Sequence, residues 1–279
     1  MNNNKNNTPE KSAVSVASDY GYKKANKSFL GSFGSAIFAG IFISIAFVFY
    51  TTVTTGAEGS WGITKLAGGF VFSLGLILVV ICGAELFTST VLSSVAWAQK
   101  RITCKQLIAS WSRVYLGNFI GAMIMLALVI SAKMYLQDDG QWGINALKIA
   151  QHKLHHTWFQ AFSLGILCNL LVCLGVWMTF HTKDPLTKAM LLILPVTMFV
   201  SSGFEHSIAN LFMVPLGIMV QHSFTPEAFA ELGYTVDSFA DLTVSHFIFN
   251  NLIPVTLGNI VGGSIIVGLG NFIIEKSDK

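Results

Sequence analysis

The sequence predicts an all-α integral membrane protein with six transmembrane helices, arranged as a 3+3 inverted repeat whose second and fifth helices are broken. Three observations predict it: an apolar composition, long uncharged stretches, and motifs that recur in the same order in the two halves. Of 279 residues, 53% are hydrophobic and only 11% are charged, and the mean hydropathy is +0.62. Because soluble domains carry about a quarter charged residues, this composition excludes a cytosolic enzyme, a disordered chain and a nucleic-acid-binding protein.

The crossings follow from eight stretches that lack Lys, Arg, Asp and Glu. Crossing about 30 Å of hydrocarbon takes about 20 apolar residues. Four stretches are sufficient alone, namely 28–57, 114–132, 154–182 and 242–274. The others form two pairs that are each interrupted by one glutamate: 66–84 and 86–99 flank Glu85, and 189–204 and 206–226 flank Glu205. Counting each pair as one interrupted span predicts six crossings.

The distribution of Lys and Arg predicts the orientation. With six crossings, 13 of the 17 Lys and Arg residues fall on the side of the N-terminus, and positive loops stay in the cytoplasm. We therefore expect both termini in the cytoplasm of a protein in the cytoplasmic (inner) membrane. The expected parts are a tail over 1–28 with a short amphipathic helix from about Asp19 to Ala25, a channel domain over 29–274, and a second tail over 275–279.

Two motifs repeat in the same order along the chain. Gly83-Ala84-Glu85 matches Gly203-Phe204-Glu205, and Leu116-Gly117-Asn118-x-x-Gly121 matches Leu257-Gly258-Asn259-x-x-Gly262. Gly40-Ile41 and Gly165-Ile166 give a weaker match. With three spans in each copy, the second copy enters the membrane from the opposite face. The predicted repeats are about 29–136 and 154–274.

The interruptions are the candidate site. A break inside lipid is tolerated only where its backbone is buried in protein or lines a cavity. Two symmetric breaks should face each other near the midplane, where two half-helix N-termini favour a negative guest. Hydroxyl groups close to the breaks are expected to donate hydrogen bonds to this guest: Thr88, Ser89, Ser201, Ser202 and Ser207.

The ionisable residues at the breaks have different expected roles. Glu85 and Glu205 are symmetric, and a carboxylate in the path would repel an anion. We therefore expect them to be structural, accepting backbone N–H groups of their own breaks, although a proton relay is the alternative. His206 has no counterpart in the first copy, where Leu86 takes its place. An ionisable side chain inside a membrane span suggests function, and imidazole makes the site pH-sensitive. Thr88 in the facing break is its expected hydrogen-bond partner.

No catalytic, metal or cofactor motif is evident. Cys82, Cys104, Cys168 and Cys173 lack the spacing of a metal site, and sequence signatures of hydrolases and nucleotide-binding proteins are absent. The outer group formed by His152, Lys153, His155 and His156 lacks a further ligand. It is therefore read as an anion-collecting vestibule in preference to a metal site.

Four stretches resemble the formate/nitrite transporter family, most closely its bacterial formate channels: GIFISIAFVFYTTVTTG, GAELFTS, KLHHTWFQAFSLGILCNLLVCL and SSGFEHSIANLF. The resemblance extends from about Tyr20 to Phe272. It implies an aquaporin-like protomer and a homopentamer with one pore in each protomer. The small residues Gly117, Gly121, Gly258 and Gly262 permit the close helix packing that such an assembly needs.

The resemblance also implies roles for individual residues. His206 takes the place of the family's central histidine and Thr88 that of its pore-loop threonine, with Lys153 and Asn169 as further pore residues. Its apolar constrictions fall on Phe72, Leu76, Leu86, Phe87 and Phe199. Phe72 and Leu76 are four residues apart and share one helix face. Such constrictions would strip water from the guest, which is costly for an ion.

The expected function is transport of formate, or of another small monovalent anion such as nitrite or hydrosulfide, across the lipid bilayer. Protons and a pH-sensitive His206 take part, and no cofactor, metal or nucleic acid is involved. The alternative is an aquaporin-like channel for water or small neutral solutes. His206 and the inward-facing basic groups favour the anion. The sequence does not separate formate from the other anions, and it predicts no enzyme.

Overall fold

The computed structural model describes residues 12–278, and every regular element among them is a helix. Most are α-helices. The elements η1 to η4 are short 3-10 helices, and η5 and η6 are π-helices. In chain order they are α1 Ala13–Ala25, α2 Phe29–Thr54, α3 Trp61–Ile81, α4 Phe87–Thr90, η1 Val91–Ser93, α5 Ser94–Ala98, α6 Cys104–Ser131, η2 Met134–Leu136, α7 Gln141–Leu154, α8 Trp158–Met178, η3 Thr179–His181, α9 Pro185–Ser201, α10 Ser207–Ser223, α11 Pro226–Glu231, η4 Val236–Phe239, α12 Val244–His246, η5 Phe247–Leu252, α13 Ile253–Ile260, η6 Val261–Leu269 and α14 Gly270–Ser277.

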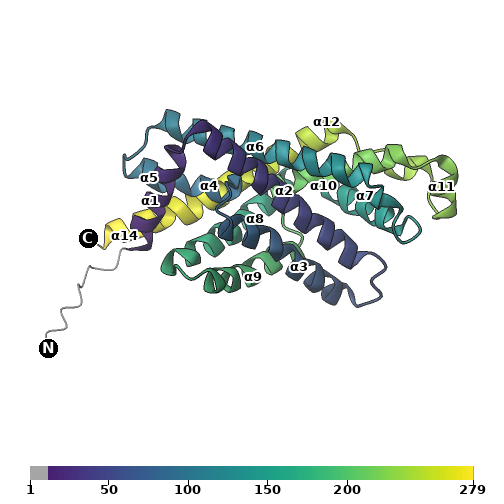
Figure 1. The fold of residues 1–279 in the computed structure, drawn as a ribbon, viewed down its shortest axis with the longest axis horizontal. Coiled ribbons are helices and arrows are strands. Elements are labelled where there is room, and N and C mark those ends of the chain that lie inside the picture. Colours follow the sequence, from purple (N-terminus) through teal and green to yellow (C-terminus); the bar gives the residue numbers. More distant parts are fainter. Residues whose placement is uncertain (1–11, 279) are drawn as a thin grey trace.

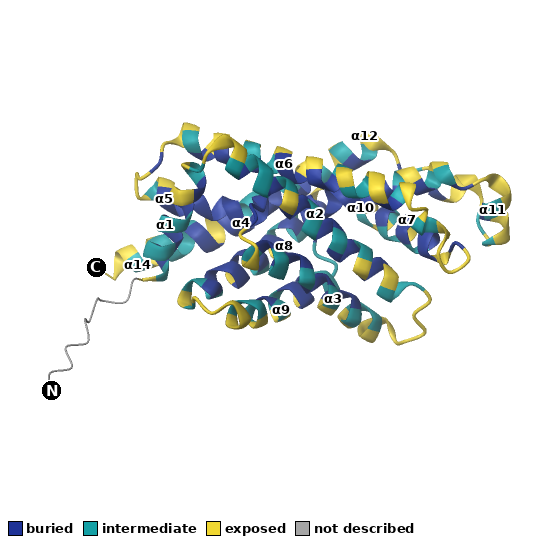
Figure 2. Ribbon diagram, viewed as in Figure 1, coloured by how far each residue is buried: buried dark blue, intermediate teal, exposed yellow. Residues whose placement is uncertain are grey.

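Five of the helices in the described part of the chain are long and apolar enough to cross a membrane: Phe29–Thr54, Trp61–Ile81, Cys104–Ser131, Trp158–His181 and the run Val236–Ser277, which is uninterrupted from Val244. The shorter α9 and α10, each of 17 residues, follow one another on either side of the Glu205 interruption. Large apolar side chains remain exposed along these helices, as expected where lipid or another protomer covers them (Figure 2). The protein is therefore a multi-pass membrane protein.

Helices from the two halves pack in equivalent pairs. In the first half α2 packs on α6, in the second half α8 packs on α13, and α3 lies against α9 between them. The first and last helices, α1 and α14, lie at the same end of the molecule, and α11 lies at the opposite end (Figure 1). This arrangement places the ends of the described chain on one side.

The N-terminal segment contributes more structure than the predicted amphipathic helix. Helix α1 begins at Ala13, six residues before the predicted start, and packs on α5. Its buried face includes Val14, Ala17 and Lys24, and a Cβ at Gly21 would come within 2.7 Å of Ser93 Cα. The first 11 residues of the predicted tail lie outside the described residues.

The first interrupted span is divided unevenly. Helix α3 has 21 residues and the length of a whole crossing, whereas the helical run after the interruption covers only 87–98. The symmetric division that the uncharged stretches suggested is therefore approximate. Helix α3 begins at Trp61, directly after its N-cap residue Ser60, and it includes Lys65, so that the predicted uncharged stretch 66–84 begins too late.

The repeated glycines pack inside one protomer. A Cβ at Gly121 would lie 2.0 Å from Ile37 O on α2, and a Cβ at Gly262 would lie 2.3 Å from Ile166 O on α8. Gly117 and Gly258 make equivalent approaches to the same two helices. These glycines therefore do not serve contacts between protomers, because their own chain already fills the space beside them.

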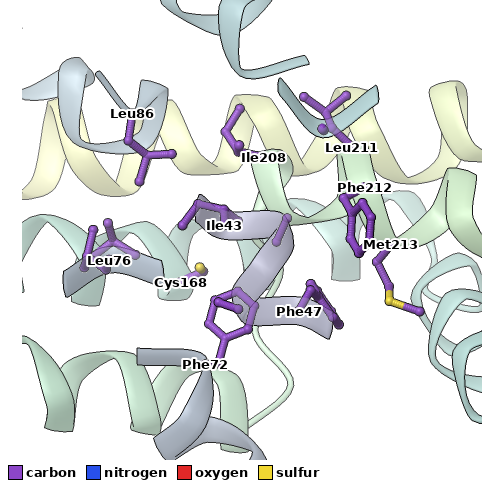
Figure 3. Packing of buried hydrophobic residues seen from close by; sticks show 14 of the residues in the cluster. Ile43, Phe47, Phe72, Leu76, Leu86, Cys168, Ile208, Leu211, Phe212 and Met213 are labelled. Atoms are coloured by element: carbon purple, nitrogen blue, oxygen red, sulfur yellow. The ribbon is translucent and has the colours of Figure 1, made fainter. Parts of the chain in front are cut away.

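A single large apolar core surrounds the interruptions. Figure 3 shows part of it: Phe47 comes from α2, Phe72 and Leu76 from α3, Leu86 from the first interruption and Cys168 from α8. These side chains are all buried. Residues 84–87 and 205–207 of the interruptions are buried in protein, as a break at membrane depth requires.

Candidate functional site

The two interruptions have the same backbone course. Gly83 has φ +68° and Gly203 has φ +72°, a conformation that glycine adopts without steric cost. In the first, Ala84 N–H donates to Val79 O at 2.9 Å; in the second, Phe204 N–H donates to Phe199 O at 2.9 Å. Each helix therefore ends in the same glycine-dependent turn.

A backbone hydrogen bond joins each turn to the first long helix of its own half of the chain, α2 or α8. Glu85 N–H donates to Ser35 O on α2 at 3.2 Å, and Glu205 N–H donates to Leu164 O on α8 at 3.3 Å. These bonds satisfy buried backbone groups that would otherwise lack partners.

One asparagine holds each interruption in place. Asn118 Nδ2 donates to Ala36 O at 2.7 Å and to Glu85 O at 2.8 Å, and its Oδ1 accepts from Phe87 N–H at 2.9 Å. The amide thus ties α6 to α2 and caps the start of α4.

Asn259 makes the equivalent bonds in the second half. Its Nδ2 donates to Gly165 O at 2.8 Å and to Glu205 O at 3.0 Å, and its Oδ1 accepts from Ser207 N–H at 2.9 Å. Both asparagines are fully buried. In the sequence, the repeated motif that contains them indicates a repeat but does not by itself indicate this role. The signal was present, because an amide at the centre of an apolar span needs polar partners.

The two glutamates are held by side chains, which corrects the expectation that they accept backbone N–H groups. Glu85 pairs with Lys24, and with Lys27 at 3.3 Å. The asparagines already occupy the backbone N–H groups of Phe87 and Ser207, so the carboxylates turn to cations.

Glu205 has an equivalent arrangement. It accepts from Lys153 Nζ at 3.0 Å, from Asn210 Nδ2 at 2.6 Å and from Asn251 Nδ2 at 3.2 Å. Both carboxylates are buried, so their hydrogen bonds and ion pairs offset the large cost of burying charge.

His206 ends the second interruption and faces Thr88, which follows the first. Its Nδ1 accepts from Ala209 N–H at 3.1 Å, so it caps α10, and its Nε2 lies 3.0 Å from Thr88 Oγ1, as the sequence analysis expected. The ring stacks on Phe199 with centroids 5.9 Å apart. Because Nδ1 is an acceptor, the proton of the neutral ring belongs on Nε2. His206 therefore donates to Thr88, and the Thr88 hydroxyl keeps its own hydrogen for another acceptor.

Asn169 holds the backbone of α4 at Thr88. Its Nδ2 donates to Thr88 O at 3.0 Å and to Asn259 O at 2.6 Å, which links the two halves. Cys173 Sγ also donates to Thr88 O, at 3.2 Å. Asn169 Oδ1 is buried and has no hydrogen-bond partner among the described residues.

Two of the other predicted hydroxyl groups, Ser89 and Ser201, donate to backbone carbonyls. Ser89 donates to Leu86 O at 3.0 Å and Ser201 to Lys65 O at 2.9 Å. Ser207 Oγ is buried without a partner among the described residues. Thr88 is thus the hydroxyl that meets His206 directly.

A cavity of about 270 Å³ opens on one side of His206. We call it the His206 cavity; His206, Phe72, Phe199 and Lys153 are among the residues that line it. The Phe72 and Phe199 rings meet edge to face with centroids 6.1 Å apart. An apolar wall with a few convergent polar groups is typical of a small-ligand site.

A second cavity, of about 930 Å³, opens beside the first interruption. We call it the five-lysine cavity, after its lysines Lys23, Lys24, Lys27, Lys183 and Lys188. Val79 and Val80 of α3 line it, whereas Phe72 of α3 lines the His206 cavity. Leu76 lies between them on the same helix and lines neither cavity.

The predicted constriction residues are not all in one place. Phe72 and Phe199 meet at the His206 cavity, and Leu76 and Leu86 are buried in the core without lining either cavity. Phe87 instead packs against Tyr115 of α6, with ring centroids 4.9 Å apart. The structure thus brings His206, Thr88, Phe72 and Phe199 together and directs Phe87 towards α6.

The outer histidine group divides: the His152 and His156 rings lie edge to face with centroids 5.3 Å apart, whereas His155 pairs with a separate residue. His152 and Lys153 line the His206 cavity, His155 Nε2 lies 2.6 Å from Asp241 Oδ2, and His156 Nε2 lies 3.9 Å from Glu205 Oε1. Within residues 12–278, no three His, Cys, Asp or Glu side chains are arranged to hold a metal ion.

A multi-pass helical fold with a buried polar site between two cationic cavities defines a membrane transport protein. The sequence profile of the family described as "Formate/nitrite transporter" matches residues 11–273. The chain belongs to the formate/nitrite transporter family, whose members are channels and transporters and not enzymes.

Characterised relatives and solved structures agree with this assignment. The chain is 52% identical over 266 residues to the formate channel FocA of Haemophilus influenzae, covering 95% of this chain and 94% of that protein. It is 52% identical over 260 residues to FocA of Escherichia coli K12, covering 93% and 91%. A solved structure described as a pentameric formate channel with formate bound is 53% identical, with a TM-score of 0.82 over 93% of this chain and 99% of that one. A solved "FNT family ion channel" is 25% identical, with a TM-score of 0.78 over 94% and 98%.

Proposed function

We propose that this protein is a pH-sensitive channel that moves formate across the membrane as a homopentamer with one pore in each protomer. The observation that carries the proposal is the Thr88–His206 pair, buried beside a cavity that also contains Lys153. Formate channels at 52% identity and the pentameric formate-bound neighbour support the substrate and the assembly.

The permeation path runs from the His206 cavity, past the Thr88–His206 pair, to the five-lysine cavity. Lysines in both cavities attract an anion, and the closed segment around Leu76 and Leu86 removes its water. The Thr88 hydroxyl, already an acceptor for His206, donates its hydrogen to the guest. Lys153 supplies a positive field, although Glu205 offsets part of its charge.

The hydrogen bonds of His206 define how pH acts. A protonated His206 ring carries a hydrogen on Nδ1 as well as on Nε2. Nδ1 can then no longer accept the hydrogen bond from Ala209 N–H, and the two hydrogens repel each other. Acidification therefore weakens the cap of α10 as it charges the ring. The charged ring can pass its Nε2 proton to a bound formate, which leaves as the neutral acid while Nδ1 retains the other proton.

The remaining parts of the architecture belong to the same proposal. The protomer is a 3+3 inverted repeat of six helices, broken at 82–86 and at 202–206, with repeats over about 29–136 and 154–274. The paired bonds of Asn118 and Asn259 support this symmetry. Both termini lie in the cytoplasm of an inner-membrane protein, with 1–28 and 275–279 flanking the channel domain. Phe72, Leu76, Leu86, Phe87 and Phe199 form the apolar constrictions.

Flux through purified protein in liposomes tests the substrate. We expect the protein to release entrapped formate faster than protein-free liposomes do, and to pass nitrite and hydrosulfide to a measurable degree. Water and glycerol permeation, measured by light scattering on the same liposomes, is the comparison. Fast water or glycerol permeation without formate flux would favour the neutral-solute channel instead.

Cysteine labelling tests the orientation. In a chain whose exposed Cys82 and Cys104 are replaced by serine, we expect Ser277→Cys to resist a membrane-impermeant maleimide in intact cells and to react after lysis. Gln137→Cys, in the loop predicted to lie outside, is the matched position and should react in intact cells. Labelling of Ser277→Cys in intact cells would show that the C-terminus lies outside and would contradict the proposed orientation.

A further inference from the structure

The five-lysine cavity is much larger than the proposed substrate requires. Its volume is about 930 Å³, against about 270 Å³ for the His206 cavity. Formate has only three non-hydrogen atoms, whereas cavities of about 300–1,000 Å³ hold ligands of metabolite or drug size. The larger cavity therefore has room for a second, bulkier occupant.

Its charge favours an anion with several negative charges. The lining contains five lysines and two carboxylates, Asp19 and Glu85, which leaves an excess of three positive charges. Glu85 is occupied by Lys24 and Lys27, and Asp19 by Arg101. Within residues 12–278, no carboxylate forms an ion pair with Lys23, Lys183 or Lys188.

The position of two of these lysines is unfavourable for the helix that carries them. Helix α9 begins at Pro185, Lys183 immediately precedes the N-cap residue Asp184, and Lys188 is in the first turn. A cation at a helix N-terminus opposes the helix dipole. The two ammonium groups therefore destabilise the N-terminus of α9, and a bound anion would offset this unfavourable charge interaction.

The lysines also come from separate parts of the chain. Lys23 belongs to α1, whereas Lys183 and Lys188 flank the start of α9, and both elements line the same cavity. Separate point charges suit an anion with charges at several places. Arginine would favour planar two-point binding of one group, and none lines this cavity.

We propose that the five-lysine cavity binds a multivalent anion of metabolite size, bearing phosphate groups or several carboxylates, and that this ligand blocks the channel from the cytoplasmic side. Such an anion is too large and too strongly charged to pass the closed segment around Leu76 and Leu86. The binding site stands on its own geometry, whereas the blocking effect rests on the proposed function.

Binding is measured first, without reference to transport. Isothermal titration of the detergent-solubilised full chain with pyrophosphate and with citrate, at matched ionic strength, reports which chemistry the cavity prefers. We expect at least one of them to bind more tightly than acetate. Lys183→Ala with Lys188→Ala should raise the Kd about tenfold, which corresponds to about 1.4 kcal/mol for the loss of two partly exposed charge contacts.

The control removes the same charge elsewhere on the same side. Lys105→Ala with Lys276→Ala affects two lysines that do not line this cavity, and it should leave the Kd unchanged. An equal Kd for both double variants, or no binding of either probe to the parent protein, would overturn the proposed site.

Block is measured in vesicles from a host without formate channels of its own. The anion that binds should inhibit formate flux when added to inside-out vesicles and not when added to right-side-out vesicles, and the Lys183/Lys188 variant should need about ten times more of it. Equal inhibition from both faces would overturn the blocking role. Binding that depends on Lys183 and Lys188 without formate flux in any vesicle would refute the proposed function and leave the site standing.

Discussion

Replacing His206 with phenylalanine is expected to reduce formate flux by about 10- to 100-fold and to abolish the response of the remaining flux to pH. The substitution keeps a ring that can stack on Phe199, but it removes the acceptor for Ala209 N–H and the donor to Thr88. A hydrogen bond to a charged group contributes about 1.5–3 kcal/mol, which corresponds to roughly this range of rates. Formate flux in liposomes at pH values from about 5 to 8 measures both effects.

Two variants separate the chemistry of the ring from its place in the fold. His206→Asn offers an oxygen that can cap α10 and an amide that can donate to Thr88, so it should retain flux, but it has no imidazole nitrogen that can take up a proton. His222→Phe changes an exposed histidine on the same helix that lines neither cavity, and it should behave as the parent protein. Wild-type flux and pH profile in His206→Phe would show that the histidine is structural.

The apolar helices were accessible to sequence reasoning because hydropathy depends on local composition alone. The positions of α2 and α8 follow from uncharged stretches, whereas α6 begins ten residues before its stretch 114–132 and includes Lys105 and Arg113. Helix α3 was less predictable, since Lys65 lies within it. A lysine near the end of a span can extend its ammonium group towards water, so a count of charged residues ended the span too early.

The candidate site was predictable where the two copies of the repeat could be compared. The motif match located both interruptions, and the resemblance to a family led to Thr88, His206, Phe72 and Phe199, which the structure brings together. It also led to Phe87, a proposed constriction residue whose ring packs on Tyr115. The rotation of a side chain at the first residue of a short helix depends on its tertiary neighbours and is not encoded in spacing.

The partners of the glutamates were out of reach for a different reason. Lys24 is 61 residues from Glu85 and Lys153 is 52 residues from Glu205. Such pairs exist only after distant helices have packed. The symmetric carboxylates indicated a shared structural role, but local reasoning assigned them the nearest backbone donors, which Asn118 and Asn259 already bind.

Asn259 is therefore where a single change should most damage the fold. In Asn259→Leu, the side chain has a similar size, but Ser207 N–H, Gly165 O and Glu205 O lose their partner inside the protein. Each buried polar group left unpaired costs about 1–3 kcal/mol, and a membrane interior offers no water in exchange. The total is comparable to the whole stability of many domains.

We expect Asn259→Leu to lose the oligomer on size-exclusion chromatography at temperatures that the parent protein withstands, and to show little or no formate flux. Asn271→Leu is the matched control, because it changes the same residue type in the same continuous helical run but removes only a bond to Val267 O four residues earlier. Its effect should stay within about 0.5 kcal/mol, as for most substitutions away from buried networks. Asn118→Leu should reproduce the defect of Asn259→Leu, since its amide holds the first interruption by the same three bonds. If Asn259→Leu matched the control in both stability and flux, the asparagines would not be what fixes the geometry of the two interruptions around His206.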